Sequence, residues 1–265
     1  MIEGLCDSFG YNVHYVHWKG IGPKVLLIHS MGMDAHSMEK LAESLENDYE
    51  VLSLTILGHG DSDSPNTLLP LQEHAKIIRN CYKQLNFFPS VLVGHSVGGM
   101  MGMVLTAERP EEFNGLVLVD IAPFEPKERP ARPTPPEYFE SEEKAREWLA
   151  ETYPGFTDYY VDNRLRHAFM RIEGKLWLKP RGDSVRSGLL IDLWPYVERI
   201  KCPVLLLIGE LSDLVSPETA EKMENKVLEI EAVIVEGTGH MIPQDVPDKF
   251  EYLVKNFLKK IYCII

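Results

Sequence analysis

The sequence predicts an α/β fold: a mostly parallel central sheet with helices on both faces and an inserted helical cap. Short apolar runs alternate with amphipathic helical patterns over the first 120 residues and again after residue 203. Residues 124–195 interrupt this alternation with a proline-rich stretch and then helical patterns without strands. A Gly-x-Ser-x-Gly motif, residues 94–98, follows an apolar strand and opens a helix. We therefore assign residues 1–123 and 196–265 to the core and 124–195 to the cap.

The N-terminal half is expected to alternate strands and helices. The predicted strands are residues 11–18, 25–28, 50–54, 91–93 and 115–119, which are continuous apolar runs or alternating patterns. The predicted helices are residues 38–45, 71–85 and 100–109. His14 and His17 lie three apart on a strand and so face opposite sides, which argues against a shared metal and favours surface or edge positions.

The cap and the C-terminal half follow. One cap helix is expected to begin at Ser141 and another to span residues 158–170, with no strand between residues 141 and 194. Strands at 203–208 and 230–235 and helices at 217–225 and 247–261 then complete the core.

Ser96 is the candidate nucleophile. A strand that turns at once into a helix needs glycine two residues either side of the apex, because a Cβ there would meet the crossing backbone. Gly94 and Gly98 occupy these positions around Ser96. The helix that follows directs its amides and the positive end of its dipole toward the serine, which favours negative charge there.

A serine hydroxyl needs a base, and the base needs a carboxylate to orient it. The loop after strand 203–208 supplies Asp213, and the loop after strand 230–235 supplies His240. Both loops are expected at the carboxyl edge of the sheet, beside Ser96. Asp120 also ends a strand and is the alternative partner for His240; we favour Asp213 because of its loop and its spacing before His240.

Five motifs in this order resemble the α/β hydrolases, of the capped carboxylesterase, proline-iminopeptidase and meta-cleavage-hydrolase type. They are His29-Ser-Met-Gly, Gly58-His-Gly-x-Ser62, Gly94-His-Ser-Val-Gly98, Gly209-x-x-x-Asp213 and Gly239-His240. The resemblance implies that Ser96 is the nucleophile, His240 the general base and Asp213 the carboxylate.

The same resemblance implies an oxyanion hole formed by the backbone N–H groups of Met31 and Val97. The family usually has glycine where this chain has Ser30. Ser30 and His95 are candidate substrate contacts; the alternatives are a hydroxyl that caps its loop and a histidine that packs in the core.

Composition excludes several classes of partner. The formal net charge of −13 argues against nucleic acid and anionic membranes, and no apolar run is long enough to span a bilayer. The four cysteines form no Cys-x-x-Cys pair and the N-terminus shows no secretory signal, so a cytoplasmic protein with reduced thiols is expected. No cofactor or metal motif is present, and the pattern leaves open whether the chain is a monomer or a homodimer.

The predicted function is hydrolysis of a small, mostly apolar carboxylic ester through an acyl-enzyme. Cleavage of carbon–carbon bonds, thioesters, lactones or amino-terminal proline by the same triad is the alternative, and a hydrolase-fold ligand receptor with little turnover is the alternative of another class. Seven basic residues against two acidic ones between residues 164 and 186 raise the further possibility that a cap arginine binds a substrate carboxylate.

Overall fold

The computed structural model describes residues 1–123, 135–182, 185 and 191–263. Its core is an eight-stranded sheet of order β1-β2-β4-β3-β5-β6-β9-β10. The strands are β1 (Ile2–Ser8), β2 (Tyr11–Trp18), β3 (Lys24–Ile28), β4 (Glu50–Leu54), β5 (Ser90–His95), β6 (Phe113–Val119), β9 (Val204–Gly209) and β10 (Ile230–Val235). From β4 onward all neighbours are parallel, whereas β1 pairs antiparallel with β2 and β2 with β4.

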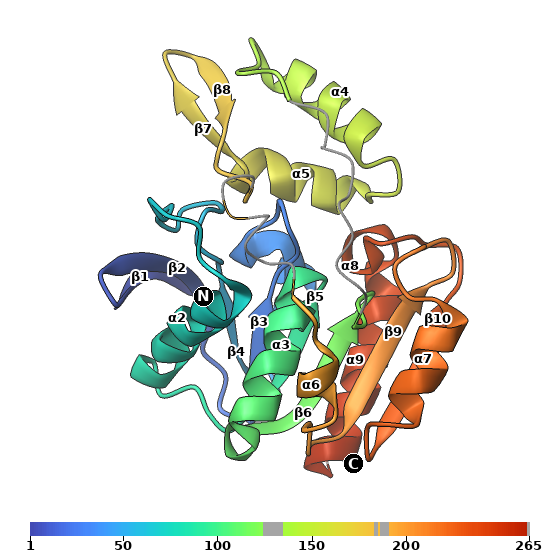
Figure 1. Ribbon diagram of the computed structural model, residues 1–265. Coiled ribbons are helices and arrows are strands. Elements are labelled where there is room, and N and C mark those ends of the chain that lie inside the picture. The colour runs from blue at the N-terminus through green and yellow to red at the C-terminus, as the bar shows by residue number, and fades with distance from the viewer. Residues whose placement is uncertain (124–134, 183–184, 186–190, 264–265) are drawn as a thin grey trace.

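Helices cover both faces of the sheet (Figure 1). They are the 3₁₀-helix η1 (Ala35–Met38), α1 (Glu39–Leu45), α2 (Leu71–Gln84), α3 (Val97–Glu108), the 3₁₀-helix η2 (Pro110–Glu112), α6 (Trp194–Val197), α7 (Pro217–Glu224), α8 (Ile242–Asp245) and α9 (Pro247–Tyr262). Apolar side chains of α2, α3, α6 and α7 share one buried cluster with one face of the sheet, and those of α1 and α9 share a second cluster with the other. The predicted parallel sheet with helices on both faces is confirmed.

The cap segment, the described residues from 135 to 182, differs in part from the predicted helical cap. It contains α4 (Glu142–Thr152) and α5 (Asp158–His167), and then a hairpin of β7 (Phe169–Ile172) and β8 (Lys175–Leu178). The expectation of no strands here was wrong. Glu173 and Gly174 both have positive φ, 49° and 81°, as a tight two-residue hairpin turn requires. Residues 124–134, with the predicted proline-rich entry to the cap, and Arg186 lie outside the described residues.

The N-terminal region also differs from the prediction. Sequence patterns placed the first strand at residues 11–18, whereas β1 precedes it and is joined to it by a turn at Phe9 and Gly10, both with positive φ. His14 and His17 are 3% and 8% exposed, so the expectation of surface positions was wrong. They do contact different partners, Glu3 and Glu50 respectively.

The cap segment is attached to loops at the carboxyl ends of the central strands (Figure 1). Arg164 of α5 donates two hydrogen bonds to Asp34, of 3.0 and 2.7 Å, and both side chains are buried. Backbone bonds from Gly60 to Pro180 and from Gly182 to Gly58 join the segment after β8 to the loop after β4. Among the described residues no helix is long and apolar enough to cross a membrane.

Candidate active site

Ser96 lies at the apex of a strained turn between β5 and α3. Its φ and ψ are 52° and −116°, a conformation that costs a non-glycine residue free energy and persists only where the surroundings impose it. A Cβ on Gly98 would lie 2.1 Å from the carbonyl oxygen of Ile28, and one on Gly94 would lie 2.5 Å from that of Gly98. The two glycines therefore let α3 pass close to β3 and β5, as the motif predicts.

Asp120 lies next to Ser96 at the carboxyl edge of the sheet. His95 pairs with Val119 across β5 and β6, so Ser96 and Asp120 are the first residues beyond two adjacent parallel strands. Asp120 is fully buried and its oxygens accept three hydrogen bonds, from Gly209 N at 3.0 Å, Ser212 Oγ at 2.6 Å and His240 Nδ1 at 2.8 Å. Burial alone would raise the pKa of Asp120, but these three hydrogen bonds together hold it below its usual value. Asp120 is therefore ionised at neutral pH.

The structure corrects the predicted partner of His240. Nδ1 of His240 bonds to Asp120, and the Asp213 side chain is exposed four residues beyond the end of β9. The residue of that loop that turns inward is Ser212, whose hydroxyl donates to Asp120. Both aspartates follow strands, and the sequence favoured Asp213 for its loop and its spacing before His240; the pairing of β6 between β5 and β9 is what distinguishes them. Nothing in the sequence marked Ser212.

His95 contacts both the backbone and the ring of His240. Its side chain is completely buried, and Nε2 donates a 2.8 Å hydrogen bond to the backbone oxygen of His240. The two imidazole rings are 4.9 Å apart between centroids. Burial lowers the pKa of His95 to about 3, so the ring is neutral. Because it is inaccessible, His95 is not the substrate contact that we considered from the sequence, and the packing alternative holds.

The loop after β3 carries the expected oxyanion donor Met31. His29 fixes this loop: its Nε2 accepts a hydrogen bond of 2.9 Å from Ile56 N, and its Nδ1–H donates 2.7 Å to Ser30 O. Burial lowers the pKa of His29 to about 4, which keeps the ring neutral for both bonds. Val97, the other expected donor, is the first residue of α3, where amides have no acceptor within the helix. The Ser30 hydroxyl is buried and makes no hydrogen bond.

Protein groups contact the six described lysine and arginine residues between positions 164 and 181. Beyond Arg164 with Asp34, the contacts are Arg166 with Glu39, Arg171 with Glu142, Lys175 with Glu140, Lys179 with Asp61 and Arg181 with the Tyr153 hydroxyl. Arg164 is the buried one of these six residues, and Nη1 and Nη2 of its guanidinium each donate a hydrogen bond to Asp34. Because these side chains already have protein partners, the contacts argue against the hypothesis that a cap arginine binds a substrate carboxylate.

A comparison with protein-family models matches residues 23–245 to the alpha/beta hydrolase fold. The chain belongs to this family. The matched region runs from the turn before β3 to the end of α8 and includes Ser96, Asp120 and His240.

Relatives within the family are hydrolases with different substrates. The chain is 26% identical over 253 residues to 2-(acetamidomethylene)succinate hydrolase of Mesorhizobium japonicum, covering 92% of this chain and 90% of the relative. It is 24% identical to esterase Rv0045c of Mycobacterium tuberculosis, covering 92% and 85%. It is 25% identical to 2-hydroxy-6-oxo-6-(2'-aminophenyl)hexa-2,4-dienoic acid hydrolase of Metapseudomonas resinovorans, covering 98% and 91%.

Solved structures agree on the fold. The crystal structure of E-2-(acetamidomethylene)succinate hydrolase superposes with a TM-score of 0.86 at 23% identity, covering 97% of this chain and 99% of that one. The prediction of an α/β hydrolase is confirmed.

Proposed function

We propose that the protein is a serine hydrolase that cleaves a small, mostly apolar carboxylic ester through an acyl-enzyme, with Ser96, His240 and Asp120 as its triad. The observation that carries the proposal is the Asp120–His240 hydrogen bond at the sheet edge where Ser96 occupies its strained turn. Aspartate before histidine in the chain, with serine first, is the order of triads in this family.

Each residue has a role that its surroundings support. Asp120 accepts from Nδ1–H of His240 and so leaves the Nε2 lone pair to take the Ser96 proton. Ser96 Oγ then attacks the ester carbonyl, and the amides of Val97 and Met31 stabilise the negative charge on the carbonyl oxygen. His240 returns its proton to the leaving alcohol. In the second half, His240 deprotonates water, which attacks the acyl-enzyme and releases the acid and Ser96.

The proposed substrate class is supported by the contacts of the basic side chains in the cap segment and by four methionines. The basic side chains described in the cap are paired with protein groups, so the proposed substrate carries no carboxylate that must be anchored by them. Met31 and Met33 lie in the loop after β3, Met100 lies in α3 with Val97, and Met241 follows His240; methionine side chains suit an adaptable acyl pocket. Cleavage of carbon–carbon bonds, thioesters, lactones or amino-terminal proline is the alternative for the same triad.

The test is turnover of nitrophenyl esters from acetate to decanoate by wild-type protein and Ser96→Ala. We expect hydrolysis that is strongest for short chains, with kcat on the order of 10⁶-fold lower in the variant. Ester turnover that Ser96→Ala leaves unchanged would refute the proposal. A complete lack of ester turnover would reject the ester and direct the search to carbon–carbon bonds and, if turnover is still absent, to a ligand receptor.

A further inference from the structure

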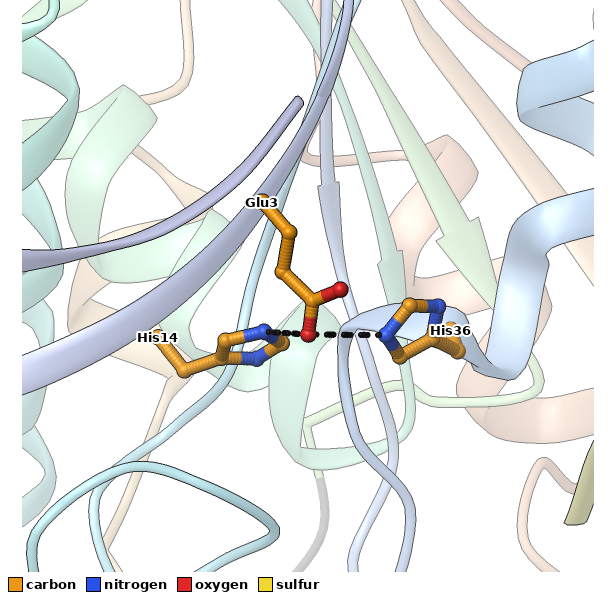
Figure 2. A group of neighbouring side chains, drawn as sticks. All are labelled: Glu3, His14 and His36. Carbon is orange, nitrogen blue, oxygen red and sulfur yellow. Dashed lines mark hydrogen bonds and ion pairs between the residues drawn. The ribbon is translucent and has the colours of Figure 1, made fainter. Parts of the chain in front are cut away.

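A group of imidazole and carboxylate side chains lies away from the candidate triad, between β1, β2 and η1. Glu3 of β1, His14 of β2 and His36 of η1 each offer one ligand atom, and these three atoms lie within 4.8 Å of one another. Figure 2 shows the Glu3 carboxylate between the two imidazole rings. Its Oε1 is 2.8 Å from Nε2 of His14 and 3.5 Å from Nε2 of His36.

His36 is one of several buried polar side chains of the described residues that lack a hydrogen-bond partner, and carboxylates lie just beyond hydrogen-bond reach of both its nitrogens, Glu3 at 3.5 Å and Glu39 at 3.9 Å. His36 is 2% exposed, and neither of its ring nitrogens makes a hydrogen bond. A buried polar group without a partner loses its hydrogen bonds to water on folding, so it calls for an explanation. A metal ion bound at Nε2 would satisfy it.

We propose that Glu3, His14 and His36 form a site for a divalent transition-metal ion of the Zn²⁺ class. Two imidazoles and one carboxylate, with water in the fourth position, are a common donor set for Zn²⁺. Bonds of about 2.0–2.1 Å in a tetrahedral site place ligand atoms about 3.4 Å apart. The Glu3–His36 separation of 3.5 Å is close to this value, and the shorter Glu3–His14 contact is a hydrogen bond that the metal would replace.

The surroundings of both rings fit metal binding at Nε2. The Thr55 hydroxyl is 2.9 Å from Nδ1 of His14 and can accept a hydrogen bond from Nδ1–H, which leaves Nε2 to the metal. Glu39 Oε1 is 3.9 Å from Nδ1 of His36, on the other side of that ring, and favours a proton there in the same way. The Glu3 side chain is 48% exposed, so the ion and its water can enter from solvent.

A second group, formed by His36, Glu39 and His167, is less suited to an ion. The rings of His36 and His167 are stacked, with centroids 3.6 Å apart and planes 11° apart. Nitrogen lone pairs lie in the ring planes, so two stacked rings cannot both direct them at one ion. Glu39 Oε2 also accepts from Asn163 at 2.6 Å and lies 3.7 Å from Arg166. We therefore place the ion at Glu3 rather than at Glu39.

A metal there would connect β1, β2 and η1. Asp34, the partner of Arg164, caps η1 two residues before His36, so the ion would bind the same short helix that the Asp34–Arg164 pair holds. Since the metal binds only the folded protein, it adds to stability.

The test is calorimetric titration with ZnCl₂ in a Cys263→Ser background, which removes the exposed thiol. We expect one equivalent to bind, with affinity at least about 10-fold weaker in Glu3→Gln. At an ion concentration of roughly 100 times Kd, the Tm should rise by about 5 °C in the background protein and much less in Glu3→Gln. Co²⁺ should give the visible absorption of a four-coordinate site, which the Glu3 variant would lose.

Two variants serve as controls. Glu50→Gln removes the carboxylate of a similar pair, Glu50 with His17 at 2.8 Å, for which the described residues supply no third ligand, and it should leave zinc binding unchanged. His167→Gln should also leave zinc binding unchanged. Binding that is insensitive to Glu3→Gln, binding that is lost in His167→Gln, or no binding at all would each overturn the site.

Discussion

Replacing Asp120 with Asn tests the part of the site in which the structure and the sequence pattern disagree. The Asp120 oxygen toward His240 also accepts from Ser212, while the other accepts from Gly209 N at 3.0 Å. In Asp120→Asn the amide oxygen can still accept from Gly209, which places the NH₂ group toward His240. That group donates to Nδ1, so the imidazole carries its proton on Nε2 and can no longer take the proton of Ser96.

The expected loss is large. Trapping a triad histidine in the wrong tautomer lowers kcat by roughly 10⁴-fold, equivalent to about 5 kcal/mol of transition-state stabilisation. The assay is ester turnover over a range of pH, and circular dichroism melts check that Asp120→Asn folds.

Asp213→Asn is the matched control, because it makes the same chemical change in an exposed side chain of the neighbouring loop. We expect its kcat to stay within about twofold of wild type. If Asp213→Asn loses most of the activity while Asp120→Asn retains it, the assignment of Asp120 is refuted.

Three further predictions concern stability. Arg164→Met leaves Asp34 buried without its partner and should cost about 3–5 kcal/mol in urea unfolding; a double variant with Asp34→Leu should cost less than the sum of the two single changes. Burial would raise the pKa of Asp34, but Arg164 holds this pKa well below its ordinary 3.8. The ion pair should therefore stabilise the fold fully above about pH 4 and progressively less below it. The stability advantage of the wild type over Asp34→Asn should be smaller in unfolding measured at pH 3 than at pH 7. Gly98→Ala, whose Cβ would lie 2.1 Å from Ile28 O, should lower the unfolding midpoint and activity together, whereas Gly239→Ala, whose Cβ would have nothing within 4 Å beyond its two chain neighbours, should leave the unfolding midpoint unchanged; equal effects of the two on the midpoint would contradict the close approach.

The core was predictable because its signals are local. Several of the parallel strands contain continuous apolar runs, as in Val204–Gly209, and the turn at Ser96 has an explicit glycine requirement. The β7–β8 hairpin was missed because its strands have four residues each and the first overlaps a helical pattern, although the Glu173-Gly174 turn was a usable signal.

The candidate site was predictable only in part, for a different reason. Ser96 and His240 are marked by neighbouring glycines, but the choice between Asp120 and Asp213 depends on which strands pair, and pairing across the sheet leaves no local pattern. The same holds for Glu3, His14 and His36, which are brought together from two strands and a 3₁₀-helix.

The proposed acyl-enzyme is tested most directly by labelling with a fluorophosphonate, which reacts with an activated serine. Intact-mass analysis followed by peptide mapping should find one adduct on Ser96 in the wild-type protein, none in Ser96→Ala, and strongly slowed labelling in Asp120→Asn. A wild-type protein that hydrolyses esters but takes up no label, or carries it on a residue other than Ser96, would contradict the account.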